Sequence, residues 1–258
     1  MTSLAAHIRA IYRYPVKGLS AERLDRTALE VGATLPADRL YAIENGPCGF
    51  DPAAPAYFPK QRFLMLMRNE RLAQLDTRFD PETHVLTVRG GQETETRGDL
   101  RTAEGRAAVE RFFAAFCADE LRGPPRVLHA PGHSFSDVAA KVVSIINLAS
   151  VAAVAELVGA PVDPLRFRAN LYVEGWSAWR ELELVGRELS VGQGARLRVV
   201  KRIQRCAATN VEPGTGVRDL AIPRTLMQAL GHSDCGIYAE VVAAGPVSVG
   251  DPVTAHEG

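Results

Sequence analysis

The chain has 258 residues, 30 basic and 30 acidic side chains, and a formal net charge of zero. This balance argues against a protein that binds nucleic acid or an anionic membrane surface through its overall charge. No apolar run is long enough to cross a bilayer, and the first residues lack the pattern of a secretion signal, so we expect a cytoplasmic protein.

The first half of the chain predicts short strands separated by turns, which is typical of a β-rich fold. Apolar and polar residues alternate in several short stretches: residues 7–14, 24–31, 38–43, 72–79 and 84–89. The last two stretches form a predicted hairpin around Asp80-Pro81-Glu82-Thr83. Apolar residues at helical spacing then predict one amphipathic helix over residues 104–116. The Pro- and Gly-rich segment 46–59 is predicted to be an exposed loop that borders a pocket.

The second half continues the mixture of strands with a few helices. The β-branched run 142–146 predicts a strand, and Asn147 is a candidate N-cap for a helix that ends near Gly159. Further elements are predicted at residues 195–203 (strand), 224–230 (helix) and 237–242 (strand). The segment Arg122-Gly123-Pro124-Pro125 is typical of a joint between two halves, or equally of a loop inside one fold, and as a joint it divides the chain into predicted domains 1–123 and 124–258. The expected fold class is therefore β-rich α+β.

Two arginines and an asparagine occur at alternate positions in Arg166-Phe167-Arg168-Ala169-Asn170. On a strand these three side chains would share one face. Such a row is usually a solvated surface. It would also suit a phosphate or a pterin-like heterocycle, because guanidinium groups bind phosphate through paired hydrogen bonds.

Cys206 follows the predicted strand 195–203 and precedes a turn at Glu212-Pro213-Gly214-Thr215-Gly216. If the alternation of that strand continues, Cys206 lies on its basic face with Arg198, Arg202 and the neighbouring Arg205. Nearby cations stabilise a thiolate, which attacks electrophiles and binds soft metals. A buried, unreactive cysteine is the alternative interpretation.

Other sequence signals for catalysis or metal binding are weak. The four cysteines form no C-x-x-C pair, which disfavours a disulfide framework, a zinc site or an iron–sulfur site. The sequence has no nucleophile elbow, P-loop, zincin motif or dinucleotide-binding fingerprint. A catalytic pair of Cys235 with His232 is disfavoured because loop residues this close in sequence seldom face each other.

Several short motifs, taken in order, resemble the MOSC superfamily, the proteins related to the C-terminal domain of molybdenum-cofactor sulfurase. They are Tyr14-Pro15-Val16-Lys17, Asp38-Arg39, Arg166 to Asn170, Arg205-Cys206-Ala207-Ala208-Thr209, and Gly250-Asp251. The resemblance covers nearly the whole chain. It implies an N-terminal β-barrel domain followed by a MOSC domain, with a molybdenum cofactor (Mo-molybdopterin) between them.

The resemblance also implies roles for individual residues. Cys206 would be the catalytic thiolate ligand to molybdenum. The residues implied to hold the pterin and its phosphate are Lys17, Gly18, Arg39, Asn147, Ser150, Arg168, Asn170, Gln204 and Arg205. Gly18 and Gln204 stand where relatives such as the mitochondrial amidoxime-reducing component have serine, so two hydroxyl contacts are missing.

The leading functional hypothesis is an oxidoreductase that reduces N-hydroxylated compounds. Its electrons would come from a ferredoxin- or flavin-type partner protein, because the sequence shows neither an iron–sulfur motif nor a dinucleotide fingerprint. A carrier of the cofactor, or of sulfur on Cys206, is the alternative. A binding barrel without chemistry is the hypothesis outside the family.

Overall fold

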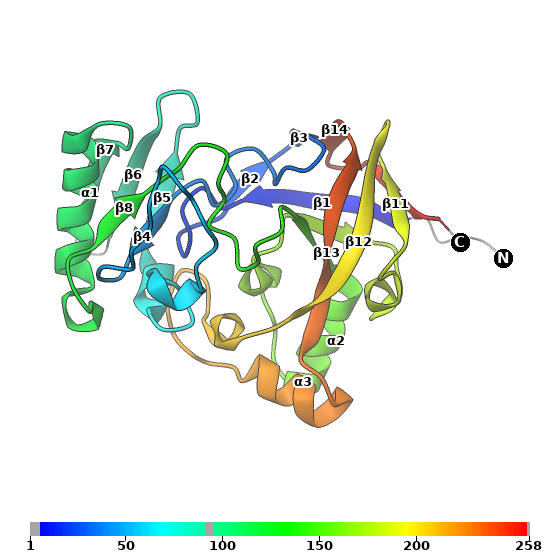
Figure 1. The fold of residues 1–258 in the computed structure, drawn as a ribbon. Helices are drawn as coiled ribbons and strands as arrows, with labels where there is room; N and C mark the ends of the chain where they lie inside the picture. Colours follow the sequence, from blue (N-terminus) through cyan, green and yellow to red (C-terminus); the bar gives the residue numbers. More distant parts are fainter. Residues whose placement is uncertain (1–5, 91–94, 257–258) are drawn as a thin grey trace.

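A closed β-barrel of seven strands dominates the computed structural model, which describes residues 6–90 and 95–256 (Figure 1). Around the barrel the order is β10-β9-β13-β12-β11-β15-β1, and β1 pairs back to β10. The strands are β1 (Ala6–Arg13), β9 (Val143–Asn147), β10 (Leu171–Glu174), β11 (Glu188–Val191), β12 (Ala195–Gln204), β13 (Asp234–Ala243) and β15 (Pro252–Ala255). The expected β-rich α+β fold is confirmed.

The barrel is closed by the start of the chain. Strand β1 pairs antiparallel with both β10 and β15, which belong to the second half, and with the short strand β2 (Glu22–Leu24). The predicted strand 24–31 is instead two pieces, because β3 (Arg26–Leu29) leaves β1 and pairs with β14 (Gly245–Ser248). The first segment of the chain is therefore built into the same barrel as the last.

Alternation along β12 fills the barrel interior. Ala195, Leu197 and Val199 are buried, whereas Arg196 and Arg198 between them are exposed. The same pattern on the other strands produces one apolar cluster inside the barrel, made mostly of Val, Leu, Ile and Ala. The strand predicted at residues 195–203 is thus confirmed, with its apolar face inward.

The remainder of the first half forms a smaller unit at the left of Figure 1. Strands β5 (Asp76–Phe79), β6 (Val85–Arg89) and β7 (Glu95–Asp99) form an antiparallel sheet, beside the β4 (Ala42–Glu44)–β8 (Arg126–Leu128) pair. Helix α1 (Ala103–Phe116) lies very close to β7, and a Cβ on Gly98 would be 2.2 Å from the Gly105 carbonyl oxygen. The predicted helix and hairpin of this half are confirmed, except that the first strand starts only at Asp76, because Glu70–Gln74 form a 3₁₀ turn.

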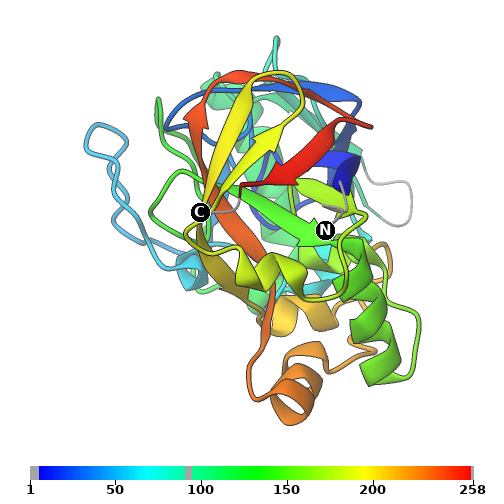
Figure 2. The ribbon, with the colours of Figure 1, turned by 90° about the vertical axis from the view of Figure 1, so that its right-hand side faces the viewer.

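Two helices cover one end of the barrel (Figures 1 and 2). Helix α2 (Leu148–Val158) is capped by the Asn147 side chain, which accepts from the Ala149 amide, and ends at Gly159 with φ +73°. Helix α3 (Ile222–Leu230) packs against α2 through Ile222 and Leu226. Both helices are confirmed, although α3 begins two residues before the predicted range 224–230. In the described part of the chain, none of the helices has the length and apolarity to span a membrane.

Candidate functional site

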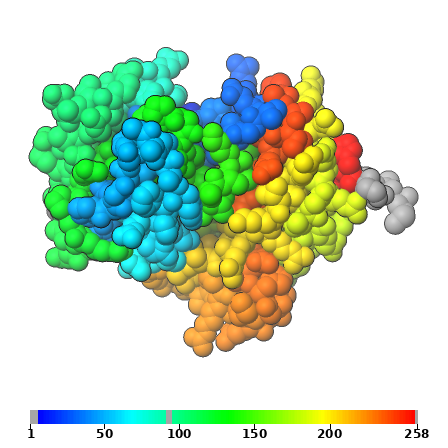
Figure 3. Space-filling model, viewed as in Figure 1, coloured from blue at the N-terminus to red at the C-terminus, as the bar shows by residue number. Residues whose placement is uncertain are grey.

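A cavity of about 410 Å³ opens where the end of β12 faces the first half of the chain. Figure 3 shows the surface hollowed between the cyan segment of the first half and the yellow strand of the barrel. The barrel side contributes residues 201–206, 166–168 and 170, and the first half contributes residues 17–18, 38–39, 60 and 65–67. The volume is within the range of about 300–1,000 Å³ typical of small-molecule sites.

The lining of this cavity is strongly cationic, although the whole chain has no net charge. Among the described residues it holds eight lysines and arginines but two aspartates, Asp38 and Asp137. The cations are Lys17, Arg39, Lys60, Arg166, Arg168, Lys201, Arg202 and Arg205. This concentration of positive charge favours an anionic ligand.

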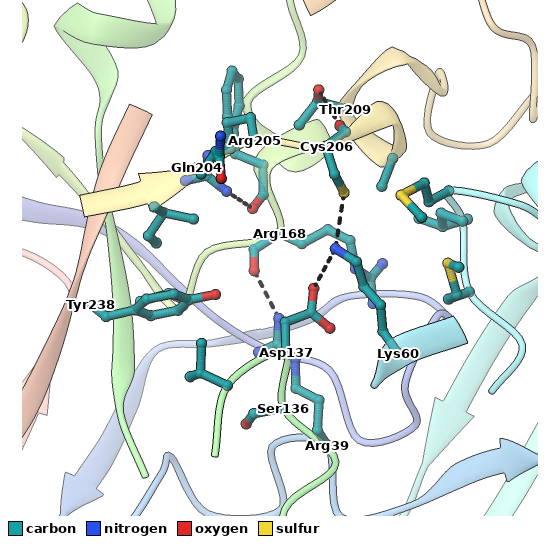
Figure 4. A pocket seen from close by; sticks show the side chains of 18 of the residues that line it. Arg39, Lys60, Ser136, Asp137, Arg168, Gln204, Arg205, Cys206, Thr209 and Tyr238 are labelled. Carbon is teal, nitrogen blue, oxygen red and sulfur yellow. Dashed lines mark hydrogen bonds and ion pairs between the residues drawn. The ribbon is translucent and has the colours of Figure 1, made fainter. Parts of the chain in front are cut away.

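Cys206 lies on the cavity wall at the point where β12 ends (Figure 4). Its carbonyl oxygen accepts from the Thr209 amide (3.0 Å) and hydroxyl (2.9 Å), which fixes the turn η6 (Ala207–Asn210) that follows. The side chain is half-buried, and its Sγ is 3.2 Å from the Lys60 ammonium. The cation beside the thiol therefore comes from the first half of the chain.

The arginines expected around the thiol are engaged elsewhere. Arg198 pairs with Glu188 at 2.9 Å on the outside of the barrel, and the Arg202 Nε donates to the Leu182 carbonyl at 2.9 Å. The register of β12 shifts between Val199 and Lys201 and again before Gln204, so the simple alternation does not continue to Cys206. Arg198 and Arg202 therefore do not lie beside the Cys206 thiol as predicted. The cation in contact with the thiol is Lys60 instead.

Asp137 links two lysines on the opposite wall. Its Oδ1 is 2.5 Å from the Lys17 ammonium and its Oδ2 is 3.4 Å from the Lys60 ammonium, and Lys17 also donates to the Phe135 carbonyl. Burial raises the pKa of Asp137, but the two lysines more than offset this and hold the pKa below its ordinary value. The carboxyl group is therefore ionised and anchors both cations.

Arg39 and Arg168 flank the buried Tyr14, with guanidinium carbons 4.4 and 4.3 Å from its ring centre. Both have left-handed backbone conformations, φ +49° and +51°, which are unusual for arginine. Arg39 is held by Asp38 and by the Arg168 carbonyl, whereas the Arg168 side chain has no hydrogen bond or ion pair with any described residue. Burial, and then the neighbouring Arg39, lower the pKa of Arg168.

The predicted strand carrying Arg166, Arg168 and Asn170 is wrong. Pro164 begins a 3₁₀ turn, η4 (Pro164–Phe167), which ends at the left-handed Arg168, and β10 starts only at Leu171. Arg166 is buried in a bidentate pair with Asp219 (2.8 and 2.7 Å). The Asn170 side chain, also on the cavity lining, bonds to Ser144 and to the Tyr12 carbonyl.

Arg205 lies over the Phe167 ring and donates to two carbonyl oxygens, those of Cys235 (2.6 Å) and Phe167 (2.9 Å). Its remaining terminal nitrogen is buried and has no hydrogen-bond partner among the described residues. Gly236 makes room for it, since a Cβ there would be 2.7 Å from that nitrogen. A buried, unpaired guanidinium nitrogen on a cavity wall is suited to an anionic ligand.

The comparisons with known proteins agree with this architecture. The family model described as MOSC N-terminal beta barrel domain matches residues 5–120, and the model described as MOSC domain matches residues 130–254. The chain belongs to the MOSC family. No curated protein matched this MOSC chain.

Solved structures similar to the MOSC chain are distant in sequence. The YuaD protein from Bacillus subtilis is 15% identical over 98% of this chain and 97% of its own, with a TM-score of 0.48. YiiM from Geobacillus stearothermophilus is 20% identical, with a TM-score of 0.35, over 45% of this chain and 54% of its own.

Two of the residues expected at the cofactor lie outside the cavity lining of this MOSC protein. Asn147 and Ser150 are fully buried and donate to the carboxyl group of Glu181, at 3.1 and 2.8 Å. Burial raises the pKa of Glu181 despite these hydrogen bonds. The structure thus assigns Asn147 and Ser150 to the polar cluster at the start of α2.

The backbone conformation and close packing at position 18 explain why this residue is a glycine. Gly18 has φ +83°, and a Cβ there would be 2.9 Å from the Leu64 carbonyl oxygen, so a serine would be strained in this backbone. Gln204 lies at the exposed end of β12 on the cavity rim. Both positions line the cavity, as do Lys17 and Arg39.

Sequence reasoning missed Lys60 and Asp137, which belong to no motif. The only indirect signal was the loop 46–59, predicted to border a pocket. None of its residues is in the lining of this cavity, but Lys60 follows it directly and the Tyr57 hydroxyl donates to the Asp137 carbonyl at 3.1 Å. Cys235 packs in an apolar cluster, and His232 accepts from the Asp234 amide, so the structure forms no Cys–His pair there.

Proposed function

We propose that this MOSC protein is a molybdenum-cofactor-dependent oxidoreductase that reduces N-hydroxylated compounds with electrons from a partner protein. One observation carries the proposal: a half-buried thiol lies on the wall of a strongly cationic cavity. A cavity of this kind suits an anionic cofactor that brings a soft metal to a thiolate.

The residues present fit such a cofactor. Arg205 offers a buried nitrogen without a partner in the described residues, and the Arg168 guanidinium is likewise unpaired there. These two groups would bind the phosphate, since arginine recognises phosphate through its planar fork. Lys17 and Arg39, which are paired with Asp137 and Asp38, would add positive charge around the pterin. Cys206 would supply the thiolate to the metal.

The cofactor would supply a site that passes two electrons to the substrate and takes up its oxygen atom. The overall change breaks the N–O bond of the N-hydroxylated compound and releases the oxygen as water, consuming two electrons and two protons. In this chain Met65, Leu66 and Met67 form an apolar stretch of the cavity lining. Thioether and aliphatic side chains adapt to varied apolar shapes, and they would hold the organic part of the substrate.

The electron donor is proposed to be a ferredoxin- or flavin-type protein that docks at the open side of the cavity. Purified protein should then reduce an N-hydroxylated substrate with a reduced viologen dye, and should be inactive with NADH alone. Sustained turnover with NADH and no added reductase would contradict this part of the proposal.

The decisive test is Cys206→Ala after expression in a host that makes the cofactor. Loss of the metal ligand should lower turnover by more than about 100-fold, since changes even one shell further out lower activity by about 10–100-fold. Cys48→Ala, at a thiol outside the cavity lining, is the control and should keep wild-type activity. Wild-type molybdenum content and turnover in Cys206→Ala would overturn the proposal. Molybdenum bound through Cys206 without turnover of any N-hydroxylated compound would favour the carrier function instead.

A further inference from the structure

We infer that Lys60 is a positioning residue that holds the Cys206 sulfur by an N–H···S hydrogen bond and makes the metal bound there easier to reduce. The inference rests on the proposed function, because it concerns a metal held by Cys206. It assigns a role to a residue of the first half of the chain, 146 positions away from the thiol.

The geometry fixes the Lys60 ammonium between two groups (Figure 4). Its Nζ is 3.2 Å from the Cys206 Sγ and 3.4 Å from the Asp137 Oδ2. Asp137 is itself held at 2.5 Å by Lys17, whose side chain is 6% exposed. Lys17 takes one oxygen of Asp137 and Lys60 faces the other, so the carboxyl group and the Cys206 sulfur together hold the Lys60 ammonium between them.

The backbone on each side of Lys60 is also fixed. Lys60 begins the 3₁₀ turn η1 (Lys60–Arg62), whose end is closed by a hydrogen bond from the Phe63 amide to the Lys60 carbonyl. Phe63 is buried and forms a β-bridge with Glu44, and Arg122 donates to the Gln61 carbonyl at 3.0 Å. Lysine side chains in contact with solvent usually extend toward water. Here the side chain is 24% exposed and its charged end points into the cavity, toward the thiol.

An ion pair with Asp137 alone does not account for this arrangement. Asp137 already has a closer cation in Lys17, at 2.5 Å against 3.4 Å for Lys60. In the described chain, Lys60 is also the one cation with a contact to the Cys206 sulfur. The shortest polar contact of the Lys60 side chain is thus the one to the sulfur.

The effect on a bound metal follows from electrostatics. Reduction adds negative charge to the metal–thiolate unit, and a fixed ammonium beside the sulfur stabilises the more negative state. Hydrogen bonds to ligating sulfur are an established means by which proteins raise the reduction potential of a metal site. Removal of the ammonium should therefore lower the potential and make transfer of electrons from the donor less favourable.

The test compares Lys60→Met, which keeps the length of the side chain without the charge, with Lys60→Arg, which keeps the charge. Arg62→Met is the matched control, because it removes a cation from the same turn at a residue outside the cavity lining. Each cofactor-loaded protein is measured for molybdenum content, for the midpoint potential of the metal by spectroscopic redox titration, and for thermal stability. Lys60→Leu, which also lacks both the N–H donor and the charge, replaces Lys60→Met if the latter does not retain molybdenum.

We expect Lys60→Met to retain molybdenum, to shift the midpoint potential to lower values and to lose about 10–100-fold in turnover. Lys60→Arg should restore most of the potential, and Arg62→Met should leave it unchanged. An unchanged potential in molybdenum-loaded Lys60→Met, or in Lys60→Leu where that variant replaces it, would overturn the inference and leave the proposed function intact. Wild-type protein that binds no molybdenum would overturn the proposed function, and the inference with it.

Discussion

The barrel interior and the cavity at its end meet along β12 but differ in chemistry, because the interior is aliphatic and the cavity is lined by many charged groups. Leu189, Leu197 and Ile237 belong to an apolar cluster of aliphatic side chains, each with no exposed surface. At the cavity, Arg205 has a buried guanidinium nitrogen without a partner in the described part of the chain, and the Arg168 guanidinium lies against the Tyr14 ring. Arg39 and Arg168 also have unfavourable backbone conformations.

This difference indicates where the stability of the fold originates. Burial of aliphatic side chains in the barrel stabilises the folded state, whereas like charges and left-handed arginines at the cavity oppose it. Functional sites often retain such unfavourable features, because a ligand satisfies them. Substitutions in the barrel should therefore affect stability strongly, and substitutions in the cavity should affect it weakly.

The largest effect on stability is expected from Leu197→Ala in the barrel interior. The side chain is fully buried, so its truncation should lower the free energy of unfolding by about 2–5 kcal/mol. Val217→Ala, at a side chain that is 54% exposed, is the control and should change it little. Chemical denaturation measures both. A loss below 1 kcal/mol for Leu197→Ala would mean that the barrel core is not the main source of stability.

A smaller effect is expected from Ser150→Ala in the polar cluster at the start of α2. Glu181 would lose its 2.8 Å hydrogen bond from the Ser150 hydroxyl while remaining buried, which should lower the free energy of unfolding by about 1–3 kcal/mol. Molybdenum content per folded protein should not change. Ser190→Ala, which removes a hydrogen bond to His256 at an exposed edge, is the control. If Ser150→Ala instead lost cofactor while its free energy of unfolding stayed unchanged, Ser150 would have the cofactor-binding role that the family resemblance implies.

The smallest effect is expected from Asp137→Asn at the cavity, and it should depend on pH. The folded-state pKa of Asp137 is lowered, so its ionised form contributes stability above the ordinary value of about 3.9. That contribution is lost as the pH falls through the lower folded-state pKa. The side chain is 45% exposed, so the difference from wild type should be less than about 1 kcal/mol at pH 7. A difference that grows below pH 4 would contradict this assignment, and Asp76→Asn is the exposed control.

Local signals in the sequence were sufficient for several elements. The alternation over residues 195–203 determined which face of β12 is buried, and Asn147 with Gly159 marked both ends of α2. These features depend on residues within one turn or strand of each other. The 3₁₀ turn at Pro164 was missed because three polar residues at alternate positions outweighed the helix-starting signal of Asp163 and Pro164.

The candidate site was predicted only in part, because its decisive contacts join distant segments. Cys206, Arg168 and Arg205 were placed at the cavity by their motifs. Lys60 could not be, since nothing near it in sequence indicates that it meets a thiol 146 residues later. The family resemblance implied that Asn147 and Ser150 hold the cofactor, and in the structure their side chains donate to the carboxyl group of Glu181.

Closure of the barrel by β1 has a consequence for how the chain folds. His7 pairs with Pro252 and with Glu174, so the contacts that complete the barrel span most of the sequence. Contacts of such high sequence separation form slowly, because a long loop must be closed first. On the ribosome, β1 emerges first but cannot pair with β15 until residues 252–255 have also emerged. The part of β1 that faces β15 must therefore remain unpaired until β15 is made, and an unpaired strand edge is a site where wrong partners can bind.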